Sequence, residues 1–176
     1  MSFTDTDLIA RALMHEDHHA FSELVRRHQS PVRGFLLRMT RGDAHRADDL
    51  AQETFIKAWR KLNTYRGGSK FSTWLFGIAL NEFRSAARQR QESSLEEMEE
   101  SAAEPSQAAT DSGSHLRLDL TAALQRLNAN ERAAILLCCQ NGLSHEEAAL
   151  ALECPLGTVK TNVLRGKEKL KRWLSL

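Results

Sequence analysis

Three groups of side chains in this 176-residue sequence have the type and spacing to do chemistry. The first is the run His15-Glu16-Asp17-His18-His19, which matches the H-E-x-x-H pattern of zinc proteases. That chemistry needs both histidines one turn apart on a continuous helix, together with a third ligand. Asp17 has the features of a helix N-cap, so His15 and His19 are expected on either side of a break. We therefore predict solvated histidines and no metal site.

The second group consists of the cysteines Cys138, Cys139 and Cys154, with His145 between them in the sequence. Adjacent residues of a helix point about 100° apart, and the sequence contains no C-x-x-C pair. These thiols are therefore predicted to be core or partly exposed side chains. The sequence also has no glycine-rich phosphate loop after a strand and no nucleophile elbow. We predict that the protein is not an enzyme and needs no cofactor.

The third group lies near the C-terminus, where Ser144 opens a short capped helix and Pro155 starts a longer basic helix. This arrangement is typical of a helix-turn-helix, whose second helix enters the DNA major groove. One face of that helix is apolar, and the opposite face carries hydroxyl, amide and guanidinium groups, which can read base edges. Flanking lysines and the helix N-terminus suit phosphates. The predicted DNA contacts are Pro155, Gly157, Thr158, Lys160, Thr161, Asn162, Arg165 and Lys167.

A small helical hairpin with a solvated basic face would show the same spacing, so this pattern alone leaves DNA binding open. Glu153 stands at the turn position where glycine is usual in such motifs. A positive φ angle there would cost up to about 1 kcal/mol relative to glycine.

The charges divide the chain into three segments. Residues 1–91 carry 15 basic and 10 acidic side chains, residues 92–115 carry seven acidic and no Lys or Arg, and residues 116–176 carry nine basic and six acidic. The middle segment has too little apolar area to offset the entropy of ordering, so it predicts a flexible acidic linker. The basic flanks predict two domains, 1–91 and 116–176, that share a polyanionic partner.

Both domains are predicted to be helical, so the fold class is all-α. Apolar residues follow the 3.6-residue period in both, and no convincing alternation of period two indicates a strand. Residues 63–70 predict a break between two helices of the first domain. The predicted helix starts lie at Thr4, Asp17, Pro31, Asp43, Asn130, Ser144 and Pro155.

The sequence also predicts where the protein works. Its longest apolar stretch, Ala133 to Cys139, is seven residues, whereas a membrane-spanning helix needs about 20. The N-terminus carries Asp5 where a signal peptide would be basic. Three cysteines, an odd number, favour reduced thiols. These features predict a cytoplasmic protein without stable membrane association.

Three motifs, in family order, resemble those of bacterial RNA polymerase sigma factors. Residues 48–60 (DDLAQETFIKAWR) resemble the core-binding helix, and FSTWL at 71–75, with Ile78, Ala79 and Asn81, resembles the promoter-melting helix. CPLGTVKT at 154–161 resembles the start of the final recognition helix. Two domains and a short linker match the extracytoplasmic-function (ECF) subgroup. The resemblance implies a subunit that binds core RNA polymerase and directs initiation from promoter −10 and −35 elements.

The resemblance implies that the first domain docks on a coiled coil of the polymerase clamp. Asp49, Gln52, Glu53 and Ile56 share a helix face at i, i+3, i+4 and i+7, apart from the main apolar stripe. That face can pair with a basic partner helix. An ordinary solvated charged face would have the same spacing.

The resemblance also implies that the loop at 63–70 and the following helix bind and melt the −10 element. Opening a duplex needs a pocket for an unstacked base and aromatic rings that replace lost stacking. Asn81 matches the family position that contacts the flipped base, whereas plain core packing remains the alternative for Phe71 or Trp74. The residues implied are Tyr65, Arg66, Gly67, Ser69, Lys70, Phe71, Trp74, Asn81, Arg84 and Arg88.

Some positions depart from the family pattern. Gly77 and Leu80 stand where basic residues are frequent, and Asn162 replaces a common arginine, which puts the usual upstream element in doubt. The docking faces are buried only in complexes, so an anti-sigma factor is an expected partner. The alternative function is a helix-turn-helix regulator that acts without polymerase.

Overall fold

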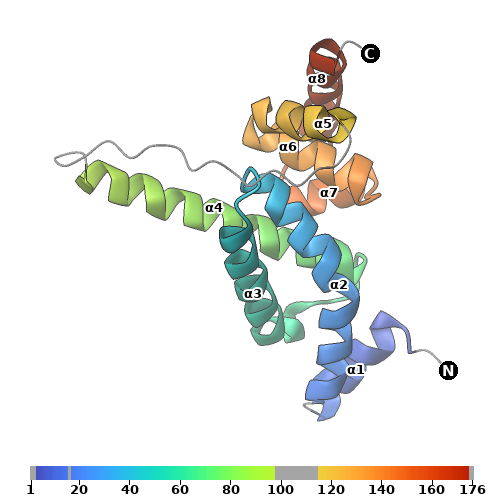
Figure 1. Cartoon of the computed structure of the whole chain (residues 1–176). Coiled ribbons are helices and arrows are strands. Elements are labelled where there is room, and N and C mark those ends of the chain that lie inside the picture. The colour runs from blue at the N-terminus through green and yellow to red at the C-terminus, as the bar shows by residue number, and fades with distance from the viewer. Residues whose placement is uncertain (1–2, 16, 98–114, 175–176) are drawn as a thin grey trace.

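The chain is built from helices throughout the part that the structure describes. This computed structural model describes residues 3–15, 17–97 and 115–174, and no strand occurs among them, which confirms the predicted all-α class. In chain order the elements are α1 (Asp5–His15), α2 (His18–Met39), α3 (Ala44–Arg60), the 3₁₀ turn η1 (Leu62–Thr64), α4 (Phe71–Glu97), α5 (His115–Arg126), α6 (Ala129–Ile135), the π-helical turn η2 (Leu136–Gln140), α7 (His145–Leu152) and α8 (Leu156–Leu174) (Figure 1).

Side-chain caps begin the first three helices, which with η1 and α4 form the N-terminal bundle. The backbone N–H of Thr4 donates to Asp7 Oδ2 at 2.9 Å, and the Asp7 N–H donates to Thr4 Oγ1 at 3.2 Å. Asp17 accepts two backbone N–H groups from the first turn of α2, and Asp43 accepts one from α3. These bonds satisfy donors that a helix start leaves free. The three predicted caps are confirmed.

The predicted helix start at Pro31 is wrong, because α2 runs through it without a break. Pro31 is exposed, where water can bond the carbonyl that the proline leaves without a donor. Val32, Phe35 and Leu36 continue the buried face of α2 beyond it. Packing along that face outweighs one lost helical hydrogen bond.

The C-terminal domain comprises α5 to α8. Its second helix begins two residues earlier than predicted: Asn128, not Asn130, is the N-cap, and its Oδ1 accepts the Glu131 N–H at 2.8 Å. Ser144 and Glu147 form the predicted capping box at the start of α7. That box fixes where the short helix of the helix-turn-helix begins.

The turn between α7 and α8 has the expected left-handed residue. Glu153 has φ 53° and ψ 45°, and its N–H donates to carbonyls of the last turn of α7. The chain therefore accepts the cost of a non-glycine residue there. Beyond it, Val159 and Val163 are buried, as predicted for the apolar face of α8.

Gly166 lets α8 lie directly against α6. A Cβ atom at this position would lie 2.8 Å from Ile135 Cγ1 and 3.2 Å from its Cδ1. Ile135 is itself 6% exposed, so it has little room to move aside. The glycine is therefore required by packing between these helices.

Gly166→Ala is expected to destabilise the protein by roughly 1–2 kcal/mol, because overpacking outweighs the better helix propensity of alanine. Gly157→Ala is the matched control, since no atom lies within 4 Å of a Cβ built there. Urea titration of both variants measures the effect, and Gly157→Ala is expected to be neutral or stabilising. Equal midpoints for the two variants would contradict this account.

The two halves pack on each other along a seam, where α7 lies against α4 and α6 reaches the end of α2. Figure 1 shows α5 to α8 on one side of α4, with α1 and α3 on the other. Arg132, 3% exposed, donates to the carbonyls of Leu124, Gln125 and Leu127 in its own domain. It also donates to Met39 O at 3.1 Å, across the seam. A buried arginine thus links the ends of α5 and α2.

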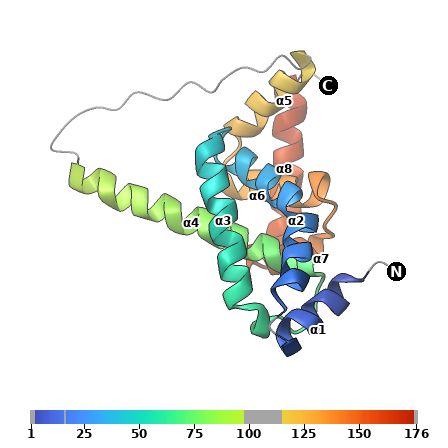
Figure 2. The same ribbon diagram turned by 60° about the horizontal axis from the view of Figure 1, so that its bottom comes forward.

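The predicted domain limits fall close to element ends. Helix α4 continues to Glu97, past the predicted limit at residue 91, and its last turns project from the rest of the molecule in Figures 1 and 2. Helix α5 begins at His115. Residues 98–114, most of the predicted linker 92–115, lie outside the described residues.

Candidate functional site

Three aromatic rings cluster at the loop between α3 and α4. Ring centroids of Tyr65, Phe71 and Trp74 lie 5.5 to 5.6 Å apart in every pair. The Tyr65 hydroxyl donates to Ser69 O at 2.5 Å, which holds the loop closed over the rings. Phe71 is 3% exposed and Trp74 is half-buried. Phe71 is therefore core packing, and Tyr65 and Trp74 retain surface that a base could contact.

A hollow lies beside these rings. It measures about 530 Å³ and is lined by the loop residues Tyr65, Gly67 and Ser69, by the start of α4, and by the first turns of α1. Gly67 has φ 71°, a conformation that favours glycine, and no atom lies within 4 Å of a Cβ built there. Arg66 is exposed in the same loop. The hollow is lined by five of the ten residues predicted for the −10 element: Tyr65, Gly67, Ser69, Lys70 and Phe71.

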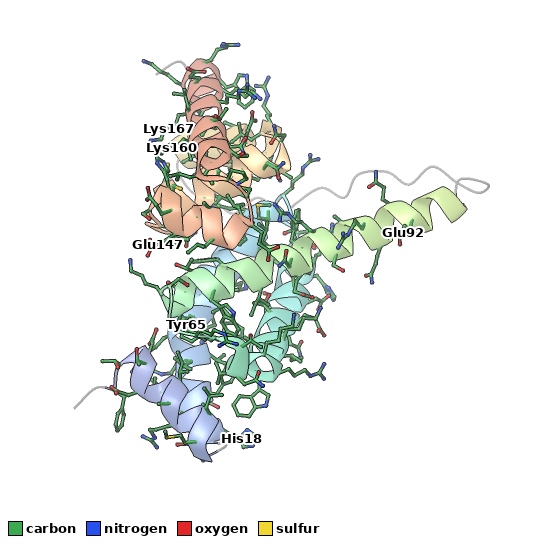
Figure 3. All side chains as sticks on the ribbon, turned by 180° about the vertical axis from the view of Figure 1, so that it is seen from behind. His18, Tyr65, Glu92, Glu147, Lys160 and Lys167 are labelled. Carbon is green, nitrogen blue, oxygen red and sulfur yellow. The ribbon has the colours of Figure 1, made fainter. Side chains whose placement is uncertain are left out.

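Three residues predicted for the −10 element, among them Lys70 of the hollow, are engaged with α7. Lys70 Nζ lies 3.0 Å from Glu147 Oε1, and Asn81 Nδ2 donates to Glu153 Oε1 at 3.0 Å. Arg84 donates to the carbonyl of Leu152 at 3.4 Å. Figure 3 shows Glu147 between Tyr65 and the lysines of α8. In this arrangement the C-terminal domain covers part of the predicted DNA surface, while Arg88 stays exposed on α4.

The outer face of α8 matches the sequence prediction. Thr158, Thr161 and Arg165 are exposed, and Asn162 is half-buried at the edge. Thr161 Oγ1 donates to Gly157 O at 2.8 Å, so its lone pairs remain available as acceptors. Lys160 and Lys167 are exposed and lie two turns apart on α8, where Figure 3 labels both. Pro155 and Gly157 are exposed at the helix N-terminus.

Leu164 belongs to the same surface and was missed in the sequence. It is 59% exposed on α8, one turn after Thr161 and Lys160. A helical wheel places it between those residues rather than on the buried side with Val163. The helical spacing alone places Leu164 on this face, but the sequence prediction did not include a leucine that directly follows a buried valine.

The residues predicted to bind polymerase border a groove between α2 and α3. The groove measures about 820 Å³; Gln52 and Ile56 line it, and Asp49 and Glu53 are exposed on the same helix. Its apolar lining comes from residues that the sequence analysis left out. Their helical spacing indicated a core face, which the structure leaves half-buried. They are Phe21, Val25, Phe55 and Trp59.

The metal and thiol alternatives find no support in the geometry. His15 ends α1, and α2 begins at His18 under the Asp17 cap, so the two motif histidines lie on different helices; Glu16 lies outside the described residues. Within residues 3–15, 17–97 and 115–174, no three His, Cys, Asp or Glu side chains converge as metal ligands would. Burial, aided by neighbouring Cys139, raises the pKa of Cys138 to about 11, which keeps it protonated.

Among the described residues, no helix is both long enough and apolar enough to cross a membrane.

Comparison with known proteins accounts for both halves. Residues 24–93 match the family model of sigma-70 region 2, and residues 117–170 match that of sigma-70 region 4. The ECF RNA polymerase sigma factor SigE of Mycolicibacterium smegmatis is 37% identical over 89% of this chain, which spans 62% of that relative's length. The RNA polymerase sigma-H factor of Pseudomonas aeruginosa is 35% identical over 97% of this chain and 93% of its own.

A solved structure shares the fold as well. The sigma factor RpoE of Bartonella quintana, in complex with the anti-sigma factor NepR, superposes with a TM-score of 0.77 and 31% identity. The match covers 89% of this chain and 97% of that one. Sequence, domain order and fold thus agree, and the chain belongs to the ECF subgroup of bacterial RNA polymerase sigma factors, which are DNA-binding factors for promoter-directed transcription initiation.

Proposed function

We propose that this chain, in the cytoplasm, joins core RNA polymerase, places α8 in the −35 major groove and melts the −10 element with the α3–α4 loop. The observation that carries the proposal is the pairing of an exposed polar face on α8 with an aromatic-lined hollow in the other half. A regulator that binds only duplex DNA has no use for the hollow. The chain acts as an initiation factor, and catalysis belongs to the polymerase.

The α8 face is suited to base recognition in the −35 element. Thr158, Thr161 and Arg165 offer hydroxyl and guanidinium groups to base edges, and the lysines suit phosphates. Asn162 stands at the edge, where its amide can read adenine. Leu164 adds an apolar surface that suits the C5-methyl group of thymine.

The hollow lined by Tyr65 and Phe71, whose rings pack on Trp74, suits a base that has left the duplex. Its aromatic wall replaces stacking, and the glycine loop admits the nucleotide backbone closely. Arg66 and Lys70 would neutralise the adjacent phosphates. Phe71 also lines the hollow, but at 3% exposure it offers little of its ring to the base.

The α2–α3 groove suits an amphipathic helix of the polymerase. Its half-buried Phe55 and Trp59 offer apolar surface, and Asp49 and Glu53 add negative charge on the exposed side of α3. A partner helix with apolar residues on one stripe and basic residues beside it would match both features. This pairing explains why an apolar groove stays uncovered in the free protein.

The closed arrangement must open before promoter binding, because Lys70, Asn81 and Arg84 are engaged with α7. The related RpoE was solved with the anti-sigma factor NepR. We propose that an anti-sigma factor likewise holds this chain inactive, and that the domain limits 1–91 and 116–176 describe the two parts that separate.

Purified core polymerase transcribing supercoiled genomic DNA, with and without the chain, tests the proposal. New transcript starts that share two spaced upstream elements are the expected result. Glu53→Lys should abolish them while leaving the fold intact, since Glu53 is exposed. Duplex binding by the chain without core polymerase, unaffected by Glu53→Lys and without new starts, would instead identify a free-standing regulator.

A further inference from the structure

Four arginines gather in a pocket at the seam, away from the hollow, the groove and the outer face of α8. The pocket measures about 410 Å³. Arg41 comes from the turn between α2 and α3, Arg46 from α3, Arg90 from α4, and Arg132 from α6 across the seam. Since both halves of the molecule supply its walls, the pocket has this shape only while the halves are packed together.

The pocket carries unbalanced positive charge. Asp43 is the one acidic side chain among its described lining residues, and its carboxylate already accepts the Arg46 backbone N–H at 3.0 Å. Within the described parts of the chain, none of the four guanidinium groups forms an ion pair with a carboxylate. Four other described arginines, Arg11, Arg26, Arg27 and Arg33, do form ion pairs with carboxylates.

The arginines also destabilise one another's charged form. Burial lowers the pKa of Arg46, and the positive charge of Arg90 lowers it further. Burial also lowers the pKa of Arg132, and the positive charge of Arg41 lowers it further. Arg132 directs its donors to backbone carbonyls, and Arg46 lies over the Phe83 ring at 5.9 Å. A bound anion would relieve the repulsion and accept the donors that Arg41, Arg46 and Arg90 retain.

We propose that this pocket binds a small phosphorylated anion through Arg41, Arg46 and Arg90, and that binding holds the two halves together. Guanidinium groups match the geometry of phosphate oxygens with paired hydrogen bonds. The volume admits a phosphate group with a substituent, and the side chains of Phe83 and Leu127 provide apolar surface for that substituent. A free phosphate compound and a nucleic-acid backbone phosphate share this chemistry, and they can be distinguished by experiment.

Such a ligand would act on the conformational equilibrium. It binds the closed arrangement, so it stabilises the state in which Lys70, Asn81 and Arg84 are covered by α7. It would therefore oppose promoter binding. This consequence rests on the proposed function, whereas binding of the anion does not, so binding is first measured without DNA or polymerase.

Thermal unfolding of the full chain in pyrophosphate, against sodium chloride at equal ionic strength, measures the binding. Pyrophosphate at about a hundredfold excess over its Kd is expected to raise the midpoint by roughly 5–10 °C. Arg46→Ala and Arg90→Ala should each weaken pyrophosphate binding by roughly tenfold to a hundredfold. Arg172→Ala, an exposed arginine of α8 outside the pocket, is the matched control and should respond like wild type.

A second variant separates binding from failure to fold. Arg90→Glu places a carboxylate among the remaining arginines, so it should raise the midpoint without pyrophosphate and abolish the response to it. An equal rise in wild type and Arg90→Ala would overturn the proposal and mean an adventitious ion only. Displacement of pyrophosphate by a short duplex, with Arg90→Ala losing duplex affinity equally, would overturn the small-molecule ligand and assign the pocket to a DNA phosphate.

Discussion

Trp74→Ala is expected to reduce open-complex formation by roughly tenfold to a hundredfold, the largest loss from any single residue of the ring cluster that adjoins the hollow. Stacking of one base on an aromatic ring contributes about 1–3 kcal/mol. Trp74 is half-buried against Tyr65 and Phe71, so one part of its ring is fixed by packing and the rest remains accessible. Permanganate footprinting of the −10 region, with core polymerase and the variant, measures the unpaired thymines directly.

The same variant should bind core polymerase and duplex −35 DNA as wild type does, because the groove and α8 lie on other elements. A template with a pre-opened −10 bubble should restore most of the lost transcription, and Trp74→Phe should retain most of it. If the bubble template restores nothing, Trp74 acts through packing of the loop and its proposed contact with a base is wrong.

Local sequence signals predicted helix starts of this chain correctly where a cap decides them, and wrongly where packing has the larger effect. Asp17, Asp43 and Ser144 were predictable as caps because a cap depends on the next few residues alone. Pro31 is a strong signal for the start of a helix. Helix α2 nevertheless continues through it, because Val32 and Phe35, which follow Pro31, are buried. That burial comes from partners distant in sequence.

The parts of the site differ in the same way. The outer face of α8 follows from helical spacing within one element, so its residues were predictable apart from Leu164. The apolar lining of the groove was not, since spacing shows that Phe55 and Trp59 share a stripe but not that the stripe stays half-covered. The seam joins residues far apart in the chain, such as Asn81 and Glu153, and no local pattern predicts it.

Gly77 departs from the family pattern and also lies at the seam, opposite α7. It stands where basic residues are frequent in sigma factors, and a Cβ built on it would lie 3.6 Å from Ala151 O and 3.7 Å from Ala151 Cα. A Cβ atom would therefore just contact the backbone of α7, and a longer side chain would have no room beyond it. A basic residue there would support DNA binding, but it would occupy the space that α7 now fills.

Gly77→Arg is accordingly expected to separate the two halves and to raise the affinity of the free protein for single-stranded −10 DNA by roughly tenfold. Losing the hydrogen bonds of Asn81 and Arg84 to α7 removes about 1 kcal/mol each from the closed arrangement. Fluorescence energy transfer between dyes on α1 and α8 reports the opening, and anisotropy with a −10 oligonucleotide reports binding.

Because an added arginine also brings charge, Glu153→Gly is needed beside Gly77→Arg. It removes the acceptor of Asn81 and places glycine at φ 53°, where glycine is favoured by about 1 kcal/mol, so α7 and α8 should keep their fold. Both variants should open the seam and strengthen binding. Stronger binding by Gly77→Arg alone, with unchanged energy transfer in both, would mean that charge rather than opening controls access to the −10 surface.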